Sequence, residues 1–301
     1  MGCAMARNAL AGGVAVFGYD PSPEQAATAG AAGIRVLGST GEVAERVDLV
    51  LTSLPSDAAL EATVDAILSA RRPQGQLLVE LSTLSLEAKE RQRGRLGEAG
   101  VDMLDCPVSG TGAQAARRDV VLFASGDRAA YERALPLLRS FARDAVFVGA
   151  FGNGMKMKLV ANLLVAIHNV AAAEAILLGL RSGLDPEALV KVLAGGAGGS
   201  RMLEVRGPMM VAEAFEPATM KLDVWQKDMR LIADFARRAG VPTPVFAATA
   251  PLYAQAIAEG RGSQDTAAVY AVLEEMANAG DRGGSDAGTI SARPGTNHER
   301  Y

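Results

Sequence analysis

Short apolar runs alternate with helical patterns over the first 150 residues of the chain. Helix-like segments cover 23–32, 57–69, 86–99 and 128–141. Between them, apolar runs predict strands at 14–19, 34–36, 48–54, 76–81, 101–105, 120–124 and 145–148. Strands that alternate with helices of this length indicate an α/β fold with a mainly parallel, doubly wound sheet. The runs at 49–51 and 77–79 lack polar alternation, as expected for strands buried on both faces.

After residue 150 the strand patterns stop, and helical patterns follow at 155–182, 186–194, 225–239, 244–259 and 266–276. Asp185 before Pro186 predicts a capped helix start, and Gly183 predicts the end of the long helix before it. Residues 279–301 are glycine-rich and lack apolar periodicity, which predicts a disordered tail. We therefore expect an α/β domain at 1–150, an all-helical domain at 151–278 and a tail at 279–301.

Composition narrows the class of protein without indicating an activity. The 301 residues are enough for two domains of about 150 residues each. A net charge of −4 gives no broad basic face for nucleic acid. Two cysteines and two histidines support neither a disulfide framework nor a metal site. The longest apolar stretch, 159–184, contains several polar and charged side chains, which favours a buried helix over a membrane span, and we expect a cytoplasmic protein.

The turns that follow the strands are where a sheet of this kind binds a cofactor. Asp20 follows the strand predicted at 14–19. An acid at this place accepts hydrogen bonds from a ribose hydroxyl and repels a 2′-phosphate, which favours NAD over NADP. The alternative is that Asp20 only caps the helix that follows it. Ser56 and Ser85 also precede helical patterns, and for Ser56 we favour capping over cofactor binding.

The glycine fingerprint that binds cofactor phosphates is incomplete. Gly2 lies 18 positions before Asp20, which matches the third glycine of G-x-G-x-x-G. The turns at Leu54-Pro55 and at Thr83 offer further groups to ribose or nicotinamide. Because two glycines and a strand are absent before Gly2, we expect about ten residues to be missing at the front, which leaves the strands at 14–19 and 48–54 without a partner. The pattern is that of a Rossmann-type domain without its first strand, followed by an all-α domain.

Two segments carry the chemistry. The segment DCPVSGTG at 105–112 follows a predicted strand, and Ser109, Gly110 and Thr111 offer hydroxyl and backbone N–H groups suited to a carboxylate. In the segment GNGMKMKLVAN at 152–162, Lys158 and Asn162 lie four residues apart and therefore on one helix face. A lysine on an otherwise apolar helix is costly to bury without a role. The alternative is a solvated Lys158 paired with a surface acid.

At these residues the chain resembles the β-hydroxyacid dehydrogenase family, which contains 3-hydroxyisobutyrate dehydrogenase, tartronate semialdehyde reductase and threonate dehydrogenase. The D-x-P-V-S-G-G segment of that family is matched at 105–110, with Thr111 in place of the last glycine. Its G-x-G-x-x-x-K-x-x-N-N segment is matched at 152–162, with Ala161 in place of the first asparagine. Its K-D-L segment is matched by Lys227-Asp228-Met229. The resemblance extends over residues 1–276 in the expected order.

The resemblance implies hydride transfer between a nicotinamide cofactor and a small 3-hydroxy acid. Lys158 would be the general acid/base, and Asn162 would orient the lysine or the substrate. Lys227 would approach both the substrate and the nicotinamide from the helical domain. The resemblance also implies NAD as the cofactor, through the acid at Asp20, and a homodimer or homotetramer.

Other interpretations remain open at this point. A relative that binds the dinucleotide without catalysis usually loses the lysine, whereas Lys158 is present. A truncated and inactive gene product is a third possibility, because of the incomplete fingerprint. His168 and Trp225 are interpreted as packing residues of the helical domain. The stretch 165–175 looks closer to the threonate branch than to the isobutyrate branch.

Overall fold

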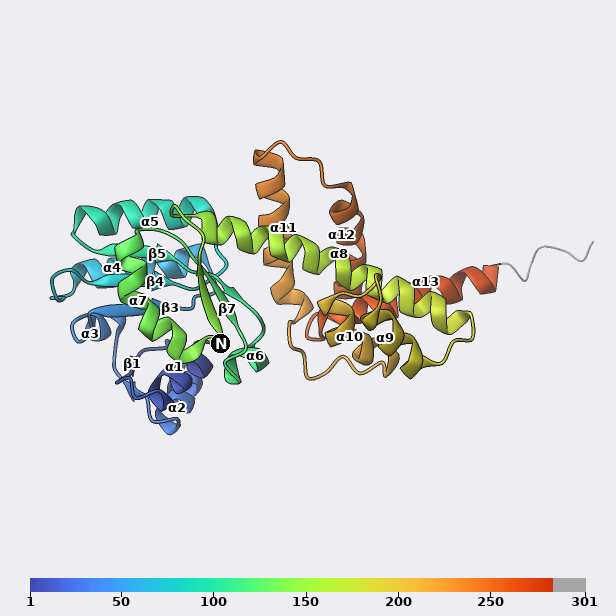
Figure 1. The fold of residues 1–301 in the computed structure, drawn as a ribbon, viewed down its shortest axis with the longest axis horizontal. Coiled ribbons are helices and arrows are strands. Elements are labelled where there is room, and N and C mark those ends of the chain that lie inside the picture. Colours follow the sequence, from blue (N-terminus) through green and yellow to red (C-terminus); the bar gives the residue numbers. More distant parts are fainter. Residues whose placement is uncertain (284–301) are drawn as a thin grey trace, which may run out of the picture.

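The computed structural model describes residues 1–283 and has an α/β part followed by a helical part, as predicted (Figure 1). A single long helix, α8 (Asn153–Arg181), runs from the α/β part into the helical part. The predicted fold class, a Rossmann-type parallel sheet followed by an all-α region, is confirmed.

The strands form three hydrogen-bonded groups. The first pairs β1 (Phe17–Gly18) with β2 (Arg35–Val36), and the second joins β3 (Leu49–Thr52), β4 (Leu77–Glu80) and β5 (Asp102–Asp105). The third joins β6 (Val108–Ser109), β7 (Val121–Ala124) and β8 (Asp144–Phe147). Every pairing is parallel except β6 with β7.

Some strand predictions need correction. The runs at 14–19 and 34–36 form strands of only two residues, while β6 has no counterpart among the predicted strands. All four residues of β4 are buried, as expected from its uninterrupted apolar run. β1 and β3 belong to different groups of strands, and the expectation of a missing first strand stays a prediction.

Seven helices belong to the α/β part, and serine caps begin several of them. Ser56 accepts a hydrogen bond from the Ala59 N–H and Ser85 accepts one from the Ala88 N–H, both at 3.2 Å, which confirms the capping interpretation of Ser56. The five-residue helices α3 and α6 were not predicted, because they are too short to show a helical period. The helices are α1 (Gly2–Ala11), α2 (Pro23–Ala31), α3 (Thr40–Ala44), α4 (Asp57–Ser69), α5 (Leu86–Glu98), α6 (Gly112–Ala116) and α7 (Arg128–Phe141).

The helical part is built around α8. Asp185 caps the next helix by accepting a hydrogen bond from the Ala188 N–H at 2.8 Å, and Gly183 adopts the left-handed φ of +81° after α8 ends, both as predicted. The remaining helices are α9 (Pro186–Gly195), α10 (Arg201–Val211), α11 (Leu222–Arg238), α12 (Pro244–Ala258), the 3₁₀ turn η1 (Thr266–Ala268) and α13 (Val269–Gly283).

Two predictions for this part were wrong. Helix α10 was missed, because glycines precede it and Pro208 lies inside it. The expected tail begins too early at 279, because α13 continues to Gly283; the rest of that segment lies outside the described residues.

Helix α8 supplies the centre of the helical core. Its apolar side chains pack with those of α10, α11, α12 and α13, and its length and hydropathy alone would also allow it to cross a membrane. Its polar residues Lys158, Asn162 and Asn169 are nevertheless buried inside the fold. In the same core, the guanidinium of Arg206 lies 2.9 Å from the carboxylate of Asp265, a buried ion pair within the helical part.

Candidate active site

The first turn of α8 is packed directly on the ends of two strands. A Cβ atom on Gly154 would lie 2.2 Å from the Phe123 carbonyl oxygen and 2.7 Å from the Asp105 carbonyl oxygen. Only glycine therefore allows the helix backbone to approach the sheet so closely. This contact places Lys158, one turn further along α8, at the junction of the two parts of the molecule.

Lys158 lies in a buried polar cluster with Asn162 and Asp228. Only 9% of Lys158 is exposed, which rules out the alternative of a solvated lysine. The Asn162 side-chain amide donates a hydrogen bond of 2.8 Å to the Asp228 carboxylate, which comes from α11. Lys156, two residues away, is exposed. The helix thus presents one of its two neighbouring lysines to the interior.

Burial and the neighbouring charges shift the pKa values of Lys158 and Asp228. Burial lowers the pKa of Lys158 below its ordinary value, the Asp228 carboxylate opposes that shift, and the nearby Lys227 ammonium adds to it. Burial raises the pKa of Asp228, against the influence of the two lysines and of the Asn162 hydrogen bond. A lysine with a lowered pKa can exchange a proton near neutral pH more readily than a solvated one.

Asp228 is the residue of this cluster that the sequence reasoning did not select. Lys227 was chosen from the same segment, and the structure places it half-buried and close enough to influence both Lys158 and Asp228. The signal that could have identified Asp228 was its position beside Lys227 together with the need of the buried Asn162 amide for an acceptor.

The predicted carboxylate cradle lies on β6 and the turn after it. Ser109 ends β6, and Gly110 has φ of +140°, a conformation that favours glycine. Thr111 begins α6 through a capping box, in which its hydroxyl accepts from the Gln114 N–H and its own N–H donates to the Gln114 side chain at 2.9 Å. The expectation that the Thr111 N–H is available to a substrate is therefore wrong, although its hydroxyl can still donate a hydrogen bond.

The predicted cofactor residues lie on turns at the ends of β1, β3 and β4. Asp20 is exposed, and one carboxylate oxygen accepts a hydrogen bond of 2.9 Å from the Ser22 N–H. The cap of α2 is Ser22, so the interpretation of Asp20 as that cap was wrong. The second oxygen of Asp20 can accept from a ribose hydroxyl.

Gly2 and the turns after β3 and β4 come together. A Cβ on Gly2 would lie 3.6 Å from the Cβ of Ser53, so α1 begins beside the turn that continues to Leu54 and Pro55. The Leu54 N–H donates a hydrogen bond of 2.6 Å to the Ser82 hydroxyl, next to the half-buried Thr83. A helix start and two adjacent turns suit the phosphates and ribose of a dinucleotide.

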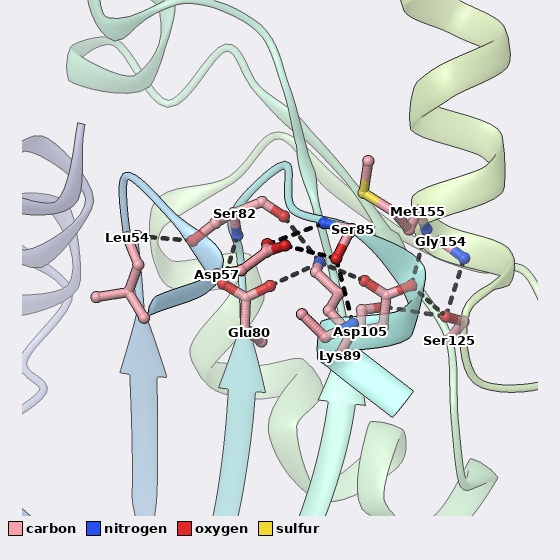
Figure 2. A network of polar contacts seen from close by, with 11 residues as sticks. Leu54, Asp57, Glu80, Ser82, Ser85, Lys89, Asp105, Ser125, Gly154 and Met155 are labelled. Atoms are coloured by element: carbon pink, nitrogen blue, oxygen red, sulfur yellow. Dashed lines mark hydrogen bonds and ion pairs between the residues drawn. The ribbon is translucent and has the colours of Figure 1, made fainter. Parts of the chain in front are cut away.

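A buried ionic network, which the sequence reasoning did not predict, lies behind these turns (Figure 2). Lys89 of α5, Glu80 of β4 and Asp105 of β5 have fully buried side chains. The Lys89 ammonium lies 2.6 Å from Glu80 and 2.7 Å from Asp105. Burial tends to lower the pKa of Lys89, but the two carboxylates outweigh it, and the pKa is raised.

A parallel sheet followed by a helical part that brings a buried lysine to its edge is the arrangement of an NAD(P)-dependent oxidoreductase. Comparison with known families agrees. Residues 1–149 match the NAD binding domain of 6-phosphogluconate dehydrogenase, and residues 152–273 match the domain described as NAD-binding of NADP-dependent 3-hydroxyisobutyrate dehydrogenase.

Curated relatives identify the family. The chain is 34% identical over 277 residues to an L-threonate dehydrogenase of Cupriavidus necator, covering 91% of this chain and 93% of the relative. It is 30% identical over 286 residues to a probable 3-hydroxyisobutyrate dehydrogenase of Mycobacterium tuberculosis, covering 93% and 96%. The chain belongs to the 3-hydroxyisobutyrate dehydrogenase-like β-hydroxyacid dehydrogenase family and is an NAD(P)-dependent hydroxyacid dehydrogenase.

Solved structures show the same architecture. A Mycobacterium tuberculosis 3-hydroxyisobutyrate dehydrogenase with L-serine superposes with a TM-score of 0.82 at 28% identity, covering 91% of this chain and 95% of that chain. Psf3 in complex with NADP⁺ superposes with a TM-score of 0.79 at 25% identity, covering 91% and 96%.

Proposed function

We propose that Lys158 is the general acid/base in the oxidation of a small 3-hydroxy acid, or in the reverse reduction. The observation that carries this proposal is the burial of Lys158 beside Asp228 and Asn162, where its pKa is lowered. A neutral amine at this place can take the proton of the substrate hydroxyl. The nicotinamide, when bound, accepts the hydride from the carbon that bears this hydroxyl.

Asn162 and Asp228 orient the base. The 2.8 Å hydrogen bond between them fixes the carboxylate, and the carboxylate favours the ammonium form of Lys158 after it has received the proton. Their proximity therefore sets the pH range in which the lysine can work as a base.

The substrate carboxylate binds between Ser109, Gly110 and Lys227 in this proposal. Ser109 at the end of β6 and Gly110 directly after it are half-buried, and Lys227 supplies a positive charge from α11. Thr111 contributes through its hydroxyl group alone, because its N–H is used by Gln114.

We propose NAD as the preferred cofactor, bound by Gly2, Asp20, Leu54, Pro55 and Thr83. Asp20 supports this choice, because a carboxylate at the ribose position repels a 2′-phosphate. The name of the family matched at 152–273 refers to NADP, so both cofactors belong in the test.

As substrates we propose L-threonate first, then 3-hydroxyisobutyrate, and tartronate semialdehyde for the reduction; the similarity to dehydrogenases and a reductase named for these compounds supports the choice. We also propose a cytoplasmic homodimer or homotetramer, supported by exposed apolar side chains on α8 at Met157, Val160 and Leu164.

The test is a steady-state assay of the purified chain with these hydroxy acids and either NAD or NADP, following reduced nicotinamide by absorbance. Activity that depends on Lys158 and is lost in Lys158→Met supports the proposal. If Lys158→Met oxidises the best substrate at the rate of the unaltered chain, the proposed role of Lys158 is wrong.

A further inference from the structure

The ammonium of Lys89 contacts acceptors at the ends of two neighbouring strands: Glu80 and Ser82 at the end of β4, and Asp105 at the end of β5. Its three N–H groups face Glu80 at 2.6 Å, Asp105 at 2.7 Å and the Ser82 carbonyl oxygen at 2.7 Å. The ammonium donates hydrogen bonds to Asp105 and to the Ser82 carbonyl oxygen, and it forms an ion pair with Glu80. In a fully buried site, these three contacts of one ammonium hold the ends of β4 and β5 in fixed positions.

Asp105 carries this network to α8. One carboxylate oxygen of Asp105 contacts Lys89, and the other accepts a hydrogen bond of 2.7 Å from the Met155 N–H. The Ser125 hydroxyl lies 3.2 Å from the same oxygen and accepts a hydrogen bond of 2.9 Å from the Gly154 N–H. The amide groups of the first helical turn have no partner inside their own helix, so these contacts hold α8 on the sheet.

The opposite side of the network reaches the cofactor turns. Ser82, whose carbonyl oxygen binds Lys89, accepts from the Leu54 N–H through its hydroxyl and donates its own N–H to Glu80 at 2.9 Å (Figure 2). Leu54 and the neighbouring Thr83 are residues of the proposed cofactor site. One buried lysine thus connects the cofactor turns with the helix that carries Lys158.

We propose that Lys89 is a positioning residue, which fixes the first turn of α8, and through it the amine of Lys158, relative to the cofactor turns. The inference rests on the proposed function of Lys158. Without Lys89, Asp105 loses the ammonium that fixes one of its two carboxylate oxygens. The carboxylate of Asp105 can then rotate, the acceptor of the Met155 N–H moves with it, and α8 is free to shift.

The test compares Lys89→Met with Arg206→Met, which removes a buried cation–carboxylate pair within the helical part. In Lys89→Met we expect the amides of Gly154 and Met155 to exchange hydrogen about tenfold faster or more, because their acceptors belong to the network. We expect kcat to fall about 10- to 100-fold, since a displacement of about 1 Å has this effect on reacting groups.

The pH profile separates positioning from mere loss of stability. Lys158 is faced by Asp228 and Lys227 from α11 and by Asn162 from its own helix. If α8 shifts, the pH midpoint of kcat moves in Lys89→Met, whereas KM for the hydroxy acid changes little. In Arg206→Met the melting temperature falls, but exchange at Gly154, kcat and the pH midpoint stay as in the unaltered chain.

Unchanged exchange and kcat in a folded Lys89→Met variant would overturn the inference, and so would equal effects in Arg206→Met. If Lys89→Met does not fold, Ser125→Ala replaces it, since it keeps the ion pairs of Lys89 and removes the hydroxyl that joins Asp105 to the Gly154 N–H. Faster exchange at Gly154 with a lower kcat then supports the inference, and no change in either refutes it. A chain that oxidises no hydroxy acid disproves the proposed function, while amide exchange still decides the anchoring role of Lys89.

Discussion

The substitution Gly154→Ala tests how closely α8 must approach the sheet. The added Cβ would lie 2.2 Å from the Phe123 carbonyl oxygen, about 1 Å inside the distance at which carbon and oxygen normally touch. The neighbouring contacts are 2.7 Å to the Asp105 carbonyl oxygen and 3.0 Å to Pro107. Two of these three atoms belong to the backbone of strand ends, so the helix has to move instead.

That movement has a calculable cost. Overpacking alone costs about 1–3 kcal/mol, and the hydrogen bonds donated by the Gly154 and Met155 N–H groups contribute about 1 kcal/mol each. The higher helix propensity of alanine returns less than ~1 kcal/mol. We therefore expect Gly154→Ala to lower the free energy of unfolding by about 2–4 kcal/mol.

The assay is urea unfolding of Gly154→Ala beside Gly97→Ala as the control. Gly97 lies in α5, and a Cβ there meets open space. We expect Gly97→Ala to raise the free energy of unfolding by about 0.5–1 kcal/mol. If Gly154→Ala is as stable as the unaltered chain, the close packing of α8 on the sheet is wrong.

Three further predictions concern the site. Lys158→Met should lower kcat/KM at least ~10²-fold. Its melting temperature should not fall, because the substitution removes a buried cation. A melting temperature that falls together with kcat/KM contradicts this prediction. Asp228→Asn removes the negative charge that raises the pKa of Lys158, so the pKa falls further and the pH midpoint of hydroxy acid oxidation moves to lower pH. A midpoint moving upward would refute this sign. Asp20→Ser should raise the ratio of kcat/KM for NADP to that for NAD about tenfold or more, and an unchanged ratio would remove Asp20 from the cofactor site.

Contacts between residues a few positions apart could be predicted from the sequence. Asp185 and Ser85 each bind a backbone N–H three residues ahead, so a short window contains both partners. The apolar run of β4 indicated burial on both faces, and the structure buries all four of its residues. Lys158 and Asn162 were found because four residues make one helical turn.

Polar contacts between residues far apart in the sequence could not be predicted. Lys89 lies in a helix rich in charged residues, and nothing in that pattern distinguishes the buried lysine from its exposed neighbours Glu87 and Glu90. Its partner Asp105 comes from β5, and Asp228, the partner of Asn162, lies 66 residues further along the chain. Only the folded arrangement of α5, β4 and β5 shows which charges meet.

The attachment of α8 to the sheet affects how this protein can be recombined with others. The chain changes from strands to helices near Gly149, but Gly154 and Met155 are bonded to Ser125 and Asp105 of the α/β part. A chimera joined at residue 150 would combine a helix start from one parent with strand ends from another. Exchangeable modules of this fold should therefore keep the first turn of α8 together with the strands that bind it.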